Sequence, residues 1–111
     1  MTIEDRKVEL GTVRVFDHGE FCQDSKEQAL KVLEEAAEVV EAWKSYDAAR
    51  AYTLREFGCE TGPVFTQAER LANELADVIQ ASCNLAFECG IDIRAALDRC
   101  EQRNRERGRL S

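Results

Sequence analysis

Several residue types that support common catalytic or metal-binding chemistries are scarce in this sequence of 111 residues. It contains a single histidine, His18, and its five cysteines form no C-x-x-C pair. Thiolate–imidazole zinc sites and Cys–His nucleophile pairs are therefore disfavoured. The odd number of cysteines also fits a disulfide framework poorly, so we expect most of them to be reduced thiols in the core.

Long apolar runs and an excess of positive charge are also missing. No segment approaches the roughly 18 to 20 apolar residues that cross a bilayer, and residues 1–7 are polar rather than signal-like. The formal net charge of −7 opposes binding to bare nucleic acid, because phosphate contacts need clustered lysine and arginine. We therefore expect a cytoplasmic protein that binds neither a membrane nor a nucleic-acid polymer.

The sequence is rich in helix-forming residues. Residues 26–46 contain no glycine or proline and many alanines, leucines and glutamates, and Ser25 with Gln28 makes a capping-box pattern before them. This pattern predicts a long helix. Residues 47–57 could continue it as a second helical piece, and residues 58–66, with two glycines and the only proline, are predicted to be a loop.

Two further helices are predicted in the C-terminal half. One covers residues 66–89 and ends with Gly90 as its C-terminal cap. The other covers residues 93–107, with Asp92 as its N-cap. The expected fold is therefore all-α, an antiparallel domain resembling a four-helix bundle.

The chain divides into an N-terminal arm, residues 1–24, and a helical domain, residues 25–111. The arm could be a short hairpin or an irregular segment. The helix at residues 26–46 is apolar around much of its circumference, which indicates burial on more than one side. We expect a homodimer or a dimer of dimers, whose assembly completes the bundle.

Acidic residues recur in pairs on two of the predicted helices. Glu35 with Glu38, and Glu74 with Asp77, are three residues apart, so each pair shares one helix face. Helical glutamates are usually solvated, but Glu74 falls within the apolar stripe of its helix, and such breaks in patterning tend to mark functional sites. That stripe contains Leu71, Val78, Ala81 and Leu85.

The acidic face of the first helix has two interpretations. Glu34, Glu38 and Glu41 cluster closely on the helical wheel and could form an ordinary solvated edge. We favour Glu35 and Glu38 as metal ligands, with Glu34 or Glu41 outside the ligand set.

Carboxylates from two facing helices can meet on one ion, because packed helices lie about 8 to 10 Å apart. Four acids in a bundle interior cannot all remain ionised without cations. Oxygen donors without a usable His or Cys favour Mg²⁺, or Mn²⁺, over Zn²⁺. A di-iron bundle would need Glu-x-x-His motifs, and the sequence has none.

The last helix adds two polar residues to its inward stripe, Asn104 and Arg107. They could hydrogen-bond to a nucleotide and hold phosphate oxygens. Alternatively, Arg107 only complements the dipole at the helix C-terminus.

Five motifs follow one another between residues 25 and 109: Glu34-Glu35-x-x-Glu38, Glu74-x-x-Asp77, Asn84, Gly90-Ile91-Asp92 and Asn104-x-x-Arg107. Their order resembles the all-alpha nucleoside triphosphate pyrophosphohydrolases of the MazG type. The resemblance implies Mg²⁺ held by Glu35, Glu38, Glu74 and Asp77, and hydrolysis of a nucleotide to monophosphate and pyrophosphate by an obligate oligomer.

The resemblance also gives two of these acids a role in catalysis and makes four further residues candidates for substrate binding. Glu35 or Glu38 would also orient the attacking water. The substrate-binding candidates are Asn104, Arg107, Lys31 and Asn84. Residues 47–66 are an insertion relative to compact members of that group.

Three functions remain open on the sequence. The first is a hydrolase of canonical or damaged nucleoside triphosphates, for control or cleaning of the nucleotide pool. The second is a phosphoribosyl-ATP pyrophosphohydrolase of histidine synthesis, which the residues 34–40 resemble but in which the Asn104-x-x-Arg107 tail is not expected. The third is a non-catalytic helical module that oligomerises or binds partners.

Overall fold

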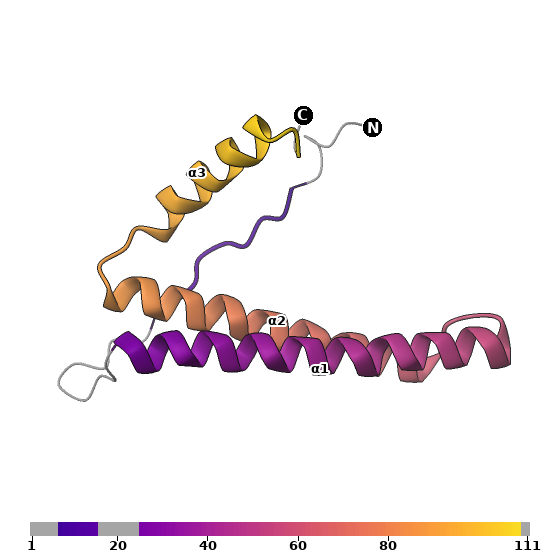
Figure 1. Cartoon of the computed structure of the whole chain (residues 1–111). Coiled ribbons are helices and arrows are strands. Elements are labelled where there is room, and N and C mark those ends of the chain that lie inside the picture. Colours follow the sequence, from indigo (N-terminus) through magenta and orange to yellow (C-terminus); the bar gives the residue numbers. More distant parts are fainter. Residues whose placement is uncertain (1–6, 16–24, 110–111) are drawn as a thin grey trace.

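The computed structural model describes residues 7–15 and 25–109, and within them it contains three helices and no strand (Figure 1). The helices are α1 (Ser25–Phe57), α2 (Gly62–Glu88) and α3 (Ile93–Glu106). The all-α prediction is thus confirmed for this part of the chain. The described part of one chain does not by itself form a four-helix bundle. His18 and Cys22 lie outside the described residues, and residues 7–15 form no hairpin.

Helix α1 is one continuous helix of 33 residues. The two predicted pieces, residues 26–46 and 47–57, join without a break because no glycine or proline separates them. At about 1.5 Å per residue the helix is about 50 Å long, and it accounts for the 53 Å length of the molecule. It ends at Phe57, and the next residue, Gly58, has a φ of 73° that is costly for residues with a side chain.

The predicted loop at residues 58–66 was too long, because α2 already begins at Gly62. Pro63 lies in the first turn of α2, where its missing N–H breaks no helical hydrogen bond and its fixed φ suits the helix. The proline starts the helix instead of interrupting it. At the other end, Gly90 with φ 69° confirms the predicted cap, and the Ile91 N–H donates to the Ala86 carbonyl at 2.8 Å.

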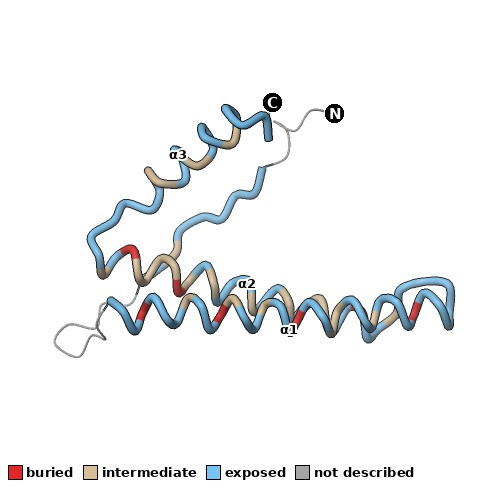
Figure 2. Tube along the Cα trace, in the orientation of Figure 1, coloured by how far each residue is buried: buried red, intermediate tan, exposed pale blue. Residues whose placement is uncertain are grey.

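Helices α1 and α2 form an antiparallel hairpin, the one extensive helix contact among the described residues (Figure 1). Three buried α1 residues, Gln28, Glu35 and Ala42, are spaced by seven, the repeat expected where two helices pack side by side. Figure 2 shows the buried positions recurring along this seam.

Helix α3 has the predicted cap, since the Asp92 carboxylate accepts a hydrogen bond from the Ala95 N–H at 3.0 Å. It rises away from the α1–α2 hairpin and has no buried residue (Figures 1 and 2). Its predicted inward stripe therefore has no extensive contact within the described chain, and Ile93 and Leu97 are exposed.

Few hydrophobic residues are buried in the described part of the chain: Ala42, Val64, Ala81 and Ala86. Many large apolar side chains are instead exposed, among them Leu33, Trp43, Phe57, Phe65 and Phe87. None of the described helices is long and apolar enough to cross a membrane.

Candidate functional site

Three carboxylates meet across the α1–α2 seam. Glu35 of α1 and Glu74 and Asp77 of α2 each place one oxygen so that the three atoms lie within 4.8 Å of one another. Glu35 is only 8% exposed, Glu74 is half-buried and Asp77 is exposed. The structure thus brings together three of the four acids that the sequence predicts as ligands.

Glu38, the fourth predicted ligand, lies one turn further along α1 on the exposed side of this cluster. Its side chain is hydrogen-bonded to Glu74, and this bond, together with the charges of Glu35 and Glu74, raises the pKa of Glu38. The nearby carboxylates thus disfavour the ionised form of Glu38.

One oxygen of Glu74, Oε2, is buried and has no hydrogen-bond partner among the described residues. A buried carboxylate oxygen without a donor is unfavourable, and a cation would satisfy it. The donor set, all carboxylate, suits Mg²⁺.

Lys31 places a positive charge next to the buried acid Glu35. Its Nζ lies 3.1 Å from Oε1 of Glu35, one turn along α1, and the side chain is 58% exposed. The hydrogen bond and the charge of Glu35 raise the pKa of Lys31, so the ammonium group stays charged at neutral pH. It is positioned to approach an anionic ligand beside the acid cluster.

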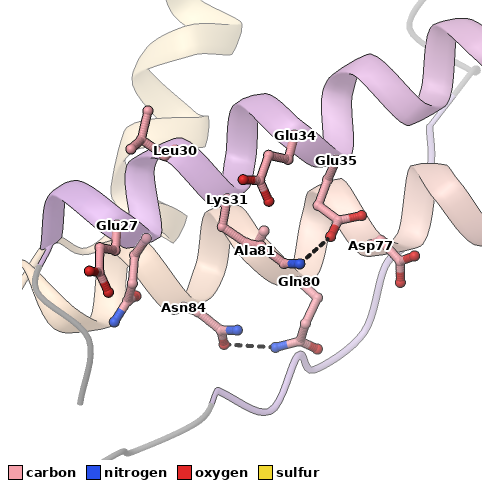
Figure 3. Close-up of a pocket in the computed structure, with 10 residues that line it drawn as sticks. Glu27, Leu30, Lys31, Glu34, Glu35, Asp77, Gln80, Ala81 and Asn84 are labelled. Atoms are coloured by element: carbon pink, nitrogen blue, oxygen red, sulfur yellow. Dashed lines mark hydrogen bonds and ion pairs between the residues drawn. The ribbon is translucent and has the colours of Figure 1, made fainter.

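A pocket of about 670 Å³ begins at Glu35 and Asp77 and runs along the hairpin past Lys31 (Figure 3). This volume is within the range of small-molecule sites. Further along, it is lined by three amide side chains, Gln28, Gln80 and Asn84, and by the acidic Glu27. Nε2 of Gln80 donates to Oδ1 of Asn84 at 2.9 Å and also lies 2.7 Å from the carbonyl of Arg14, in the N-terminal arm.

The acid cluster and the pocket lie in a chain that matches a known family. Residues 2–104 match the model of the PRA-PH family, described as phosphoribosyl-ATP pyrophosphohydrolase. This match spans most of the chain, including the arm and every residue of the acid cluster. The chain belongs to the phosphoribosyl-ATP pyrophosphohydrolase family. That family is part of the MazG-like all-alpha superfamily, which confirms the resemblance seen in the sequence. No curated protein and no solved structure matches.

For this member of the phosphoribosyl-ATP pyrophosphohydrolase family, the predicted substrate-binding residues fall into two groups. Lys31 and Asn84 line the pocket. Asn104, on α3, and Arg107, its C-terminal cap, do not line the pocket, and α3 itself lies away from the hairpin (Figure 1). Asn104 donates to Sγ of Cys100 at 3.7 Å, and Arg107 is the exposed C-terminal cap of its helix.

Two pocket residues, Gln28 and Gln80, were missed by sequence reasoning. The sequence pattern assigns Gln28 to a capping box, but its side-chain amide makes no hydrogen bond among the described residues, so that role is wrong. The spacing of seven between Gln28 and Glu35, which puts both on one helix face, was the available signal.

Proposed function

We propose that this chain hydrolyses phosphoribosyl-ATP to phosphoribosyl-AMP and pyrophosphate, with Mg²⁺ as its cofactor. The observation that carries the proposal is the cluster of Glu35, Glu74 and Asp77 in a chain that belongs to this family. The sequence alone ranked a general nucleoside triphosphate hydrolase first. The family match favours the alternative, phosphoribosyl-ATP, as the substrate.

Glu35, Glu74 and Asp77 would hold the metal, with Glu38 completing the set from the exposed side. When bound, Mg²⁺ would neutralise phosphate charge and make water a better nucleophile. Glu38 would orient the attacking water and accept its proton. Glu35 is the alternative for this role. The Lys31 ammonium would pair with phosphate oxygens that extend into the pocket.

We propose in addition that the chain assembles into an oligomer. A hairpin that buries so few hydrophobic residues and exposes Leu33, Trp43 and Phe65 is poorly covered as a monomer. A homodimer or a dimer of dimers would cover these side chains. It would also give α3 a partner, and through it Asn104 and Arg107 could contribute to the site of another subunit.

A parallel turnover assay tests the proposed substrate. The protein is incubated with Mg²⁺ and, separately, with phosphoribosyl-ATP and each common nucleoside and deoxynucleoside triphosphate, and the products are resolved by chromatography. We expect the highest kcat/KM for phosphoribosyl-ATP, with pyrophosphate and phosphoribosyl-AMP in equal amounts. A higher kcat/KM for a canonical nucleotide would favour the general hydrolase. Release of orthophosphate would mean cleavage at the terminal bond, and no turnover at all would favour a non-catalytic module.

A further inference from the structure

Gln28 is a buried amide without a hydrogen-bond partner in the described structure. The residue is 5% exposed, and both Oε1 and Nε2 of its side chain are inaccessible to solvent. An amide in this state has lost its hydrogen bonds to water and gained none from the protein, which is unfavourable. Buried groups of this kind need an explanation, and a bound ligand is one.

The position of Gln28 says which part of a ligand it would meet. It lines the same pocket as Glu35 but lies seven residues, or about 10 Å, nearer the start of α1. Lys31 lies between the two. The pocket therefore has one end at the acid cluster, for a metal and phosphates, and another two helical turns away, where amide side chains and the acidic Glu27 line it.

The other amides of the pocket are already hydrogen-bonded. Gln80 donates to Asn84 and to the carbonyl of Arg14. Among the three amide side chains that line the pocket, the one with no hydrogen bond is Gln28. The amide of Gln28 can bind a planar group that both donates and accepts hydrogen bonds.

We infer that Gln28 is a specificity-determining residue that binds the adenine ring of the substrate. The inference rests on the proposed function, which places the phosphates at the acid cluster. Adenine presents the N6 amino donor beside the N7 acceptor, and a glutamine amide pairs with both at once. Oε1 of Gln28 accepts from the amino group, and Nε2 donates to N7.

The test measures equilibrium binding of ATP and of 7-deaza-ATP, which lacks the N7 acceptor, to the full chain in Mg²⁺. Wild-type protein is expected to bind ATP about tenfold more tightly than 7-deaza-ATP, the effect of one buried hydrogen bond. Gln28→Leu should bind both nucleotides with the same, weaker affinity. Such a loss of discrimination would not follow from a purely structural role.

Gln67→Leu is the matched control. Gln67 also has a buried unpartnered oxygen, Oε1, but it lies on α2 outside the pocket, so this variant should keep the wild-type preference. If Gln28→Leu does not fold, Gln28→Met gives the same comparison with a flexible side chain of similar length. The inference is overturned if wild-type protein does not bind ATP or does not distinguish the two nucleotides, or if the folded Gln28 variant distinguishes them as well as wild type.

The binding measurement does not depend on hydrolysis. Turnover of phosphoribosyl-ATP by wild-type protein, measured separately, tests the proposed function. Discrimination without turnover would contradict that function and still support adenine binding by Gln28. Turnover without discrimination would support that function and contradict adenine binding by Gln28.

Discussion

Glu74 occupies a position in the α1–α2 seam that a hydrophobic residue would fill in an ordinary helical hairpin. It lies in one row with Leu71 and Val78, all three half-buried, and its Oε2 has no partner among the described residues. Such a carboxylate destabilises the metal-free hairpin. Sites that break the patterning of their helix tend to be functional, and the position of Glu74 beside Glu35 and Asp77 gives the physical reason here.

The crowding of acids predicts a pH dependence of stability. The pKa of Glu38 is raised in the folded chain, so the folded state holds this proton more tightly than the unfolded state. The free energy of unfolding should therefore fall as the pH rises from the ordinary glutamate range through the raised pKa of Glu38. Urea denaturation of metal-free protein across this pH range measures the free energy of unfolding.

Glu38→Gln should reduce this pH-dependent decrease in the free energy of unfolding and make the metal-free protein more stable at neutral pH. Glu41→Gln is the control, because Glu41 is exposed and pairs with Lys44 at 3.3 Å, outside the cluster. Identical pH profiles for wild type and Glu38→Gln would show that Glu38 has no raised pKa.

Local patterning identified Glu74 and Asp77 correctly as members of a cluster, because a helical wheel shows which residues share a face. It failed for Gln28. A glutamine three residues after a serine at a helix start fits a capping box, and only the packing of α2 against α1 shows that this amide is buried in a pocket instead.

At the scale of elements, the site depends on the pairing of α1 with α2. Each helix supplies part of the acid cluster, and the antiparallel arrangement puts Asp77 near Glu35 and Asn84 near the start of α1 (Figure 3). Gly90 and Asp92 marked their helix ends correctly, since these signals are local, whereas the capping box at Ser25 and the loop at residues 58–66 were wrong. Local signals did not predict where α3 lies, because an apolar stripe indicates that a helix packs without identifying its partner.

Mg²⁺ should stabilise this helix pair. A cation that binds the folded cluster and not the unfolded chain adds about 2.7 kcal/mol at a concentration 100 times its Kd. Thermal melting in EDTA and in several millimolar Mg²⁺ should show a higher Tm with the metal. The shift should shrink in Asp77→Asn and persist in Glu41→Gln. Equal Tm values with and without Mg²⁺ in the wild-type protein would contradict the metal site.

At the scale of the whole molecule, the described part of a single chain exposes more large apolar side chains than it buries. Leu33 is 66% exposed and Trp43 is 51% exposed on α1, the helix whose sequence is apolar around much of its circumference. Apolar surface of this extent marks interaction sites. The sequence predicted the need for a partner, but the geometry of assembly depends on a second chain.

Light scattering should therefore find a dimer or a tetramer. Leu33→Glu, which places a charge on the exposed apolar surface, should shift the protein toward smaller or less stable species. Lys44→Glu adds negative charge at an exposed polar position of the same helix and should keep the wild-type mass. A stable, active monomer of wild-type protein would refute the assembly.

The measurement that tests the central claim most directly is the release of pyrophosphate from phosphoribosyl-ATP as a function of Mg²⁺ concentration. Wild-type protein and Glu41→Gln should show saturable, Mg²⁺-dependent release that EDTA abolishes. Asp77→Asn should retain the helical fold and lose at least about 100-fold in kcat/KM, because even residues that only support metal ligands contribute about 10- to 100-fold. Release that persists in EDTA, or that survives in Asp77→Asn at the wild-type rate, would contradict the account.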